Sequence, residues 1–313
     1  MSTNPFHRAI YLTGPTAAGK TVVGVALARR LGAEIIALDS MTLYRGMDIG
    51  TAKPTLAERS EVPHHLIDVL DPWQSASVAD YRGWALEALI SIESRGKRAL
   101  FVGGTALYLI SLLRGLFEGP GADPALRRSL EEEAEQAGDA AMHARLERLD
   151  PATAARLHPH DRRRVIRAIE VITVTGQLLS TLQTEHAHPA PAEVPVFALE
   201  LPRRALRERI DRRVLQMFEA GLAEEVRSLL SAPKPLAPVP AQAVGYREVI
   251  QMLEGDQALE ETISRVQART RQFAKRQMTW FRGLVEVCLW PVEPTQSAEV
   301  IADRLARHLG PSN

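Results

Sequence analysis

A glycine-rich loop near the N-terminus has the residue pattern of a phosphate-binding site. Residues 14–21 read Gly-Pro-Thr-Ala-Ala-Gly-Lys-Thr and fit the pattern Gly-x-x-x-x-Gly-Lys-Thr. In such a loop the glycines let consecutive backbone N–H groups face an anion at the positive end of the next helix. Lys20 would reach the phosphates, and the hydroxyl of Thr21 would bind Mg²⁺. The residues predicted to hold phosphate are Gly14, Pro15, Thr16, Ala17, Ala18, Gly19, Lys20 and Thr21.

A carboxylate and a hydroxyl follow two further apolar segments. Asp39 follows the segment 34–38, and Thr105 follows two glycines after the segment 98–102. In a parallel sheet, the carboxyl ends of such strands meet at the edge where ligands bind. P-loop hydrolases commonly place an acid after a later strand to hold Mg²⁺, whereas glycines stand here. The pattern favours group transfer to a substrate at Asp39, although a turn-capping role for Asp39 and a helix-capping role for Thr105 stay open.

The elements that position these residues alternate between strand and helix in the first third of the chain. Apolar runs predict strands at 9–13, 34–38 and 98–102, with a further candidate at 65–70. Helical spacing predicts helices at 20–31, at 77–93 behind a capping box of Ser77 and Asp80, and from Thr105 onward. Strands separated by such helices predict an α/β fold with a parallel sheet covered on both faces.

The middle of the chain has a different pattern. After the breaker at 119–121 only helical spacing appears, at 127–137, 139–149, 151–157 and 161–175. Beyond it we expect strands at 196–201 and 284–289 and helices at 204–218, 222–230, 246–253, 259–280 and 298–309. We therefore expect a core formed by residues 1–120 and 186–313, and a mostly helical insertion domain at 121–185.

Composition restricts the class of protein. Lys and Arg (38) balance Asp and Glu (38), so no global field draws the chain to nucleic acid. No apolar run is long enough to span a bilayer and the N-terminus has no apolar signal core, so we expect a cytoplasmic protein and no membrane partner. The one cysteine, Cys288, lies in an apolar run and is expected to be buried. His64 and His65 have no ligand partners at metal-site spacing.

Six stretches taken together resemble the tRNA dimethylallyltransferases, also called tRNA isopentenyltransferases. They occur in that family's order and span most of the chain. The stretches are 14–21, Asp-Ser-Met-Thr-Leu-Tyr-Arg-Gly-Met-Asp-Ile-Gly-Thr-Ala-Lys-Pro at 39–54, Pro-His-His-Leu-Ile-Asp at 63–68, Val-Gly-Gly-Thr-Ala-Leu-Tyr at 102–108, Val-Gly-Tyr-Arg-Glu at 244–248 and Lys-Arg-Gln-Met-Thr-Trp-Phe-Arg at 275–282.

The resemblance implies a reaction and a fold. A dimethylallyl group would pass from dimethylallyl diphosphate to N6 of the adenosine 3′ of the anticodon (tRNA position 37), in a Mg²⁺-dependent, nucleotide-kinase-like P-loop core. The loop, Lys20 and a Thr21-bound Mg²⁺ would stabilise the departing diphosphate. Asp39 would accept the N6 proton, and Thr105 would help to hold the diphosphate or the bridging oxygen. The target base must leave the anticodon-loop stack to reach this site. We expect the protein to be a monomer.

The resemblance also implies contacts with the tRNA anticodon stem-loop. The run 272–282 interleaves cations with aromatic residues, which suits backbone contact and base stacking; an ordinary amphipathic helix would instead bury Phe273, Trp280 and Phe281. In 161–167, Arg162 and Arg163 replace the family's Pro and Gln, and a solvated basic face is the alternative. The expected RNA contacts are Asp39, Ser40, Met41, Thr42, Thr105, Arg127, Arg163, Arg164, Arg167, Gln242, Gly245, Tyr246, Arg247, Lys275, Arg276, Gln277, Thr279, Trp280 and Arg282.

Three other functions fit the loop alone. A P-loop nucleotide or small-molecule kinase is the nearest, with the insertion as its lid, but the stretches 39–54 and 275–282 have no role in it. An isopentenyltransferase acting on a free adenine nucleotide would have little use for the RNA-contacting patches. A regulatory P-loop module would bind nucleotide without turnover.

Overall fold

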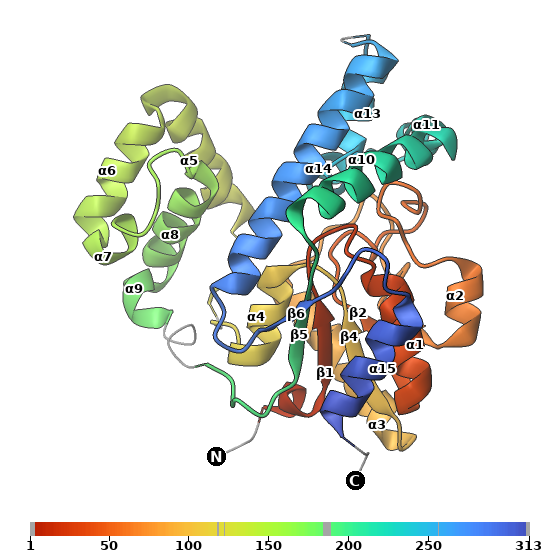
Figure 1. Ribbon diagram of the computed structural model, residues 1–313. Helices are drawn as coiled ribbons and strands as arrows, with labels where there is room; N and C mark the ends of the chain where they lie inside the picture. The colour runs from red at the N-terminus through yellow and green to blue at the C-terminus, as the bar shows by residue number, and fades with distance from the viewer. Residues whose placement is uncertain (1–3, 118, 122, 184–188, 256, 311–313) are drawn as a thin grey trace. The chain divides into compact units, whose positions relative to one another are not determined.

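A six-stranded parallel sheet forms the centre of the protein (Figure 1). The computed structural model describes residues 4–117, 119–121, 123–183, 189–255 and 257–310. The strand order is β3-β2-β4-β1-β5-β6, and all described pairings are parallel. The strands are β1 (Ile10–Thr13), β2 (Ala33–Ala37), β3 (His64–His65), β4 (Arg98–Val102), β5 (Val196–Glu200) and β6 (Cys288–Pro291). The predicted α/β fold is confirmed.

Two apolar layers cover the sheet. On one face, Ile10, Leu12 and Leu100 pack against α1 (Lys20–Leu31) and α15 (Ala298–Leu309). On the other, Tyr11 and Phe101 pack against α3 (Val78–Ser94) and α4 (Ala106–Arg114). Successive side chains of a strand point to opposite faces, and here helices cover both faces. Both faces are therefore apolar, and the strands read as continuous hydrophobic runs.

Local sequence signals predict the ends of several elements accurately. The helix predicted at 20–31 is α1, with the same ends. The capping box predicted for α3 is confirmed, because Asp80 N donates to Ser77 Oγ and Ser77 N donates to Asp80 Oδ2. The candidate strand at 65–70 is wrong in extent. Leu66 and Asp68 adopt positive φ (59° and 57°), which breaks the extended backbone after β3.

The C-terminal part of the chain forms helices that lie above the sheet edge (Figure 1). They are α10 (Arg203–Glu219), α11 (Leu222–Leu230), α12 (Pro238–Ala241), α13 (Tyr246–Leu253) and the long α14 (Leu259–Arg282), while α2 (Leu56–Glu61) precedes β3. The strand predicted at 284–289 begins later, as β6, because residues 284–287 form a turn closed by Val287 N and Leu284 O.

The prediction that Cys288 is buried is wrong. Its side chain is exposed, as is that of Pro291, whereas Leu289 and Trp290 are half-buried. β6 is the edge strand of the sheet and pairs only with β5 among the described strands. An apolar run therefore does not bury every side chain at an edge. Within the described residues, no helix is both long enough and apolar enough to cross a membrane.

A second compact unit, Arg114–Pro189, is helical throughout its described secondary structure, whereas residues up to Leu113 and from Ala190 onward form the sheet unit. Its helices are α5 (Pro124–Ala137), α6 (Asp139–Leu149), α7 (Pro151–Ala154), α8 (Arg162–Thr175) and α9 (Leu179–Leu182). They enclose their own core around Leu130, Leu146 and Ile169. The insertion expected at 121–185 falls in this unit, and its C-terminal boundary, 185/186, lies outside the described residues.

Candidate functional site

The glycine-rich loop joins β1 to the N-terminus of α1, as the motif requires. Gly14 and Gly19 have positive φ (135° and 91°), and a Cβ on Gly14 would lie only 2.8 Å from Leu199 O. Glycine is therefore needed where the loop crosses β5. The Lys20 ammonium folds back over the loop and donates to Pro15 O at 2.8 Å. The Lys20 ammonium and the positive end of the α1 dipole therefore lie together at the loop.

Burial changes the acid–base properties of two groups beside the loop. It lowers the pKa of Lys20 to about 8, an effect that the Asp39 carboxylate opposes and the Arg213 guanidinium increases. It raises the pKa of Asp39, against the opposing effects of the Met41 N–H group and the Lys20 ammonium. A lysine that is easily neutralised and a carboxyl that holds a proton readily are typical of sites that bind anions and move protons.

Hydrogen bonds hold Asp39 and Thr105 beside each other. Asp39 follows β2, and its Oδ1 accepts from Met41 N at 2.8 Å. Thr105 N donates to Leu38 O at 3.1 Å, and Thr105 Oγ1 accepts from Ser40 N at 3.1 Å. The approach of the two strand ends leaves no room for a side chain at Gly103, whose Cβ would lie 2.1 Å from Leu38 O. Asp39 therefore has the turn-capping contact with Met41 N, and this hydrogen bond orients its carboxylate.

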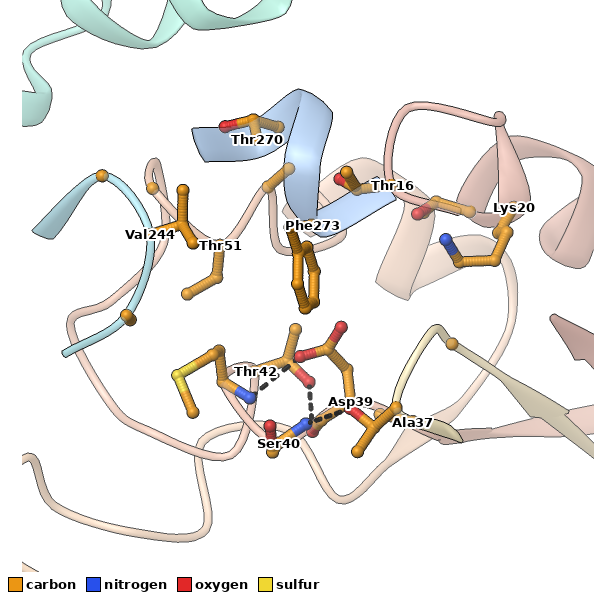
Figure 2. A pocket seen from close by; sticks show the side chains of 18 of the residues that line it. Thr16, Lys20, Ala37, Asp39, Ser40, Thr42, Thr51, Val244, Thr270 and Phe273 are labelled. Carbon is orange, nitrogen blue, oxygen red and sulfur yellow. Dashed lines mark hydrogen bonds between the residues drawn. The ribbon is translucent and has the colours of Figure 1, made fainter. Parts of the chain in front are cut away.

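These groups open into one cavity of about 420 Å³ within the sheet unit. Figure 2 shows Asp39 and Lys20 at its wall and Phe273 pointing into it from α14. Part of the lining is polar, with Lys20, Arg213 and Asp39. Apolar side chains complete much of the rest, among them Val214, Met217, Val239, Val244, Val266 and Phe273. A cavity of this kind suits a ligand with an anionic end and a hydrocarbon end.

Several predicted site residues meet at this cavity. Besides Thr16, Lys20, Thr21, Asp39 and Thr105, its lining includes Ser40, Met41, Thr42, Gln242, Gly245, Tyr246, Arg276 and Gln277. Gly14, Pro15, Ala17, Ala18 and Gly19 form the adjoining loop. Arg247 is half-buried in the first turn of α13 and is not part of the lining. The sequence motifs therefore converge in space although more than 200 positions separate them along the chain.

A buried lysine stabilises the segment 39–54 that carries Asp39. Lys53 donates to Tyr44 O at 2.8 Å and to the carboxylates of Asp48 and Asp68 at 2.5 and 2.6 Å. Its side chain is only 1% exposed. On the other side of the segment, Glu225 accepts from the backbone N–H groups of residues 48–50 and from the hydroxyl of Tyr246. The segment is thus anchored at several points rather than loosely attached.

The other predicted residues on α14 lie on its outer face. Lys275, Thr279 and Trp280 border a shallow groove there with Gln272 and with Arg276, which also lines the cavity. Trp280 is 47% exposed and Phe273 38%, whereas Phe281 is fully buried. The ordinary amphipathic helix, which would bury all three aromatics, is therefore wrong for two of them. Arg282, just beyond, donates to Glu200 at 2.7 Å.

The predicted arginines of the helical unit have two different environments. Arg127 and Arg167 both donate to Oε2 of the fully buried Glu170, at 2.6 and 2.7 Å. Their cationic groups thus neutralise an internal carboxylate, whose pKa is lowered by these bonds in spite of its burial. Arg163 and Arg164 are exposed on α8, and Arg164 lies 3.4 Å from Asp161. Their exposure fits both the predicted RNA contact and a solvated basic face.

Arg213 lines the cavity but is not among the residues predicted from the sequence. It projects from α10 into the cavity, and burial lowers the pKa of its guanidinium. Helix α10 also contains Arg203, Arg204, Arg207, Arg209 and Arg212. No spacing pattern distinguishes one arginine in such a run, because only the packing of α10 over the sheet edge decides which one faces inward. Phe273, an aromatic residue of the run 272–282, is likewise a cavity residue that no local pattern indicates.

The donor set beside the loop fits Mg²⁺. Thr21 Oγ and the Asp39 carboxylate supply oxygen, and both line the cavity. Among the described residues there is no group of three or more His, Cys, Asp and Glu side chains that could hold a metal by themselves. Magnesium commonly binds with one or two protein oxygens, substrate phosphates and water. The residues present therefore suit a cation that arrives with a phosphate ligand.

Comparisons with known proteins agree with this geometry. Residues 42–284 match the family model described as IPP transferase, and residues 8–68 match that described as isopentenyl transferase. The chain is 44% identical to a tRNA dimethylallyltransferase of Geobacter metallireducens (94% of this chain, 96% of the relative). It is 47% identical to one of Alkalilimnicola ehrlichii (96% and 95%).

Solved structures give the same result. The structure is similar to the crystal structure of a tRNA isopentenylpyrophosphate transferase from Bacillus halodurans, with a TM-score of 0.70, 39% identity and coverage of 96% of this chain and 94% of the other. It is also similar to a eukaryotic dimethylallyltransferase described as acting on tRNA, with a TM-score of 0.76, 28% identity and coverage of 92% and 74%.

Proposed function

Because the chain belongs to the IPP transferase family, we propose that it transfers a dimethylallyl group from dimethylallyl diphosphate to N6 of the adenosine 3′ of a tRNA anticodon. One observation carries the proposal: a loop with the phosphate-binding pattern and a buried carboxyl group, that of Asp39, open into the same part-apolar cavity. The loop is suited to the diphosphate, the apolar wall to the allyl group and Asp39 to the incoming amine.

The reaction exchanges one bond for another. The bond between N6 and the allylic carbon forms, and the bond between that carbon and the bridging oxygen of diphosphate breaks. Negative charge grows on the diphosphate as it leaves, and Lys20, Arg213 and the N–H groups at the start of α1 stabilise it. Thr21 Oγ1 would help to hold Mg²⁺, which would supply further charge neutralisation to the leaving group.

Asp39 accepts the proton that N6 loses. An exocyclic amine is a weak nucleophile, so a positioned base strengthens it as the new bond forms. The raised pKa of Asp39 suits this role, because a carboxyl with a higher pKa is a stronger base. Thr105, which accepts from Ser40 N, has its hydroxyl proton available for the diphosphate or the bridging oxygen.

The outer face of α14 is the RNA-contacting surface in this proposal. Lys275 and Arg276 would contact phosphates, and Trp280 would stack on a base. Replacing Trp280 with Ala is expected to weaken binding of an anticodon stem-loop about tenfold, since stacking on one base contributes roughly 1–3 kcal/mol. Fluorescence anisotropy of labelled RNA measures this. Trp73→Ala, which removes the tryptophan whose ring the Lys234 ammonium contacts, is the matched control and should leave RNA affinity unchanged.

The stem-loop assay tests the proposed function directly. Purified protein with Mg²⁺ and dimethylallyl diphosphate should add one dimethylallyl group to an anticodon stem-loop that carries three adenosines after the central anticodon base. Mass spectrometry of the digested RNA identifies the product nucleoside. A second stem-loop with guanosine at the target position should stay unmodified.

The opposite pattern would reject the proposal. Absence of product on the RNA, together with turnover of AMP and dimethylallyl diphosphate, would indicate an enzyme that acts on free nucleotide. Consumption of ATP with a small acceptor would indicate a kinase.

A further inference from the structure

The side chain of Gln277 lies on the opposite side of α14 from the exposed groups around it. It is 5% exposed, on the inner face with Ala274, Met278 and Phe281. Its neighbours Lys275 and Thr279 border the groove on the outer face. The sequence predicts Gln277 among the RNA contacts, yet its amide forms hydrogen bonds with backbone groups of this chain at the sheet edge.

Both ends of the Gln277 amide are used. Oε1 accepts from Thr16 N of the phosphate loop at 2.8 Å, and Nε2 donates to Gly104 O at 2.8 Å. A Cβ on Gly104 would lie 2.4 Å from Nε2, so any larger residue there would displace the amide. Both bonds of the buried Gln277 amide are made to backbone groups, so losing either bond would leave a backbone group without this partner.

The two backbone segments joined by Gln277 belong to the two halves of the site. Thr16 is part of the loop proposed to hold the diphosphate. Gly104 precedes Thr105, whose hydroxyl accepts from Ser40 N next to Asp39. Described hydrogen bonds therefore run from the phosphate loop through one side chain of α14 to the segment that carries the proposed base.

We propose that Gln277 is a positioning residue that sets the spacing between the phosphate loop and the Asp39–Thr105 pair, and does not bind RNA. The inference rests on the proposed function, because that spacing fixes the distance from the leaving diphosphate to the attacking amine. Transfer rates depend steeply on such distances, and a displacement of about 1 Å can slow a reaction about 100-fold. Gln277 thus links the helix that carries the RNA surface to both catalytic loops.

Gln277→Met is the direct test, because methionine keeps the length and apolar stem of the side chain but makes neither hydrogen bond. We expect kcat to fall about 10- to 100-fold and the affinity for inorganic pyrophosphate with Mg²⁺ to weaken severalfold. The Kd for the anticodon stem-loop should change less than about twofold, because the outer face is untouched. Gln267→Met on the same helix is the matched control. It loses a hydrogen bond to Asp211 O and leaves both loops alone.

A second variant approaches the same contact from the other side. Gly104→Ala displaces the amide, so it should reproduce the loss of kcat even if Gln277→Met folds poorly, and the double variant should lose little more than either single one. A Gln277→Met protein with normal kcat and pyrophosphate affinity but weakened stem-loop binding would overturn the inference, and so would additive losses in the double variant. Failure of the wild-type protein to modify the stem-loop would instead reject the proposed function.

Discussion

Replacing Asp39 with Asn is expected to slow dimethylallyl transfer by about 10²- to 10⁴-fold, the usual contribution of a positioned general base. The affinity for pyrophosphate should change far less. Asparagine has nearly the same shape and keeps an acceptor for the Met41 N–H group, so the turn after β2 should persist. It cannot accept the N6 proton at neutral pH. Single-turnover kinetics with the stem-loop measures the rate, and calorimetry with pyrophosphate and Mg²⁺ measures the affinity.

The choice of pH matters for this comparison. The Asp39 carboxylate opposes the lowering of the Lys20 pKa by burial, so its removal should move that pKa below about 8. Measurements on both proteins at several pH values below about 8 separate the loss of the base from this change in the charge of Lys20. Equal losses of rate and affinity under these conditions would mean that Asp39 binds Mg²⁺ or supports the fold and is not the base.

Replacing Lys20 with Met is expected to weaken pyrophosphate binding strongly and to slow transfer by about 10²- to 10³-fold. The ammonium lies at the loop, and its positive charge stabilises the negative charge that develops on the leaving group. Methionine has a similar length and no charge, so the cavity keeps its volume. Thermal unfolding of both proteins checks that the fold is retained.

The pH dependence of pyrophosphate binding gives a sharper measurement on the same variant. In the ligand-free protein Lys20 has a pKa of about 8, so its charged form predominates below that pH and is lost above it. Affinity should therefore fall as the pH rises through about 8. The carboxylate of Asp39 and the guanidinium of Arg213 face the same ammonium and remain in the variant. The difference between wild-type and variant profiles isolates Lys20, and parallel profiles would contradict its role.

Local patterns in the sequence were enough to locate the phosphate loop and most helices. The ends of α1 and α6 follow from helical spacing, and the start of α3 follows from its capping box. Such features depend on residues a few positions apart, so they can be read from the chain alone. The six matching stretches were equally readable, since each is contiguous. The α/β fold followed from strands alternating with helices.

Only the tertiary structure decided which side chains meet. The inward turn of Arg213 among the arginines of α10, and the burial of Gln277 beside the exposed Trp280, depend on what each helix face packs against. The exposure of Cys288 depends on β6 being the sheet edge. Periodicity shows which residues share a face but not what that face contacts, because packing joins segments that are distant in the chain. The sequence by itself thus determined the chemistry available at the loop, and the packing of α10 and α14 determined the cavity in which it can act.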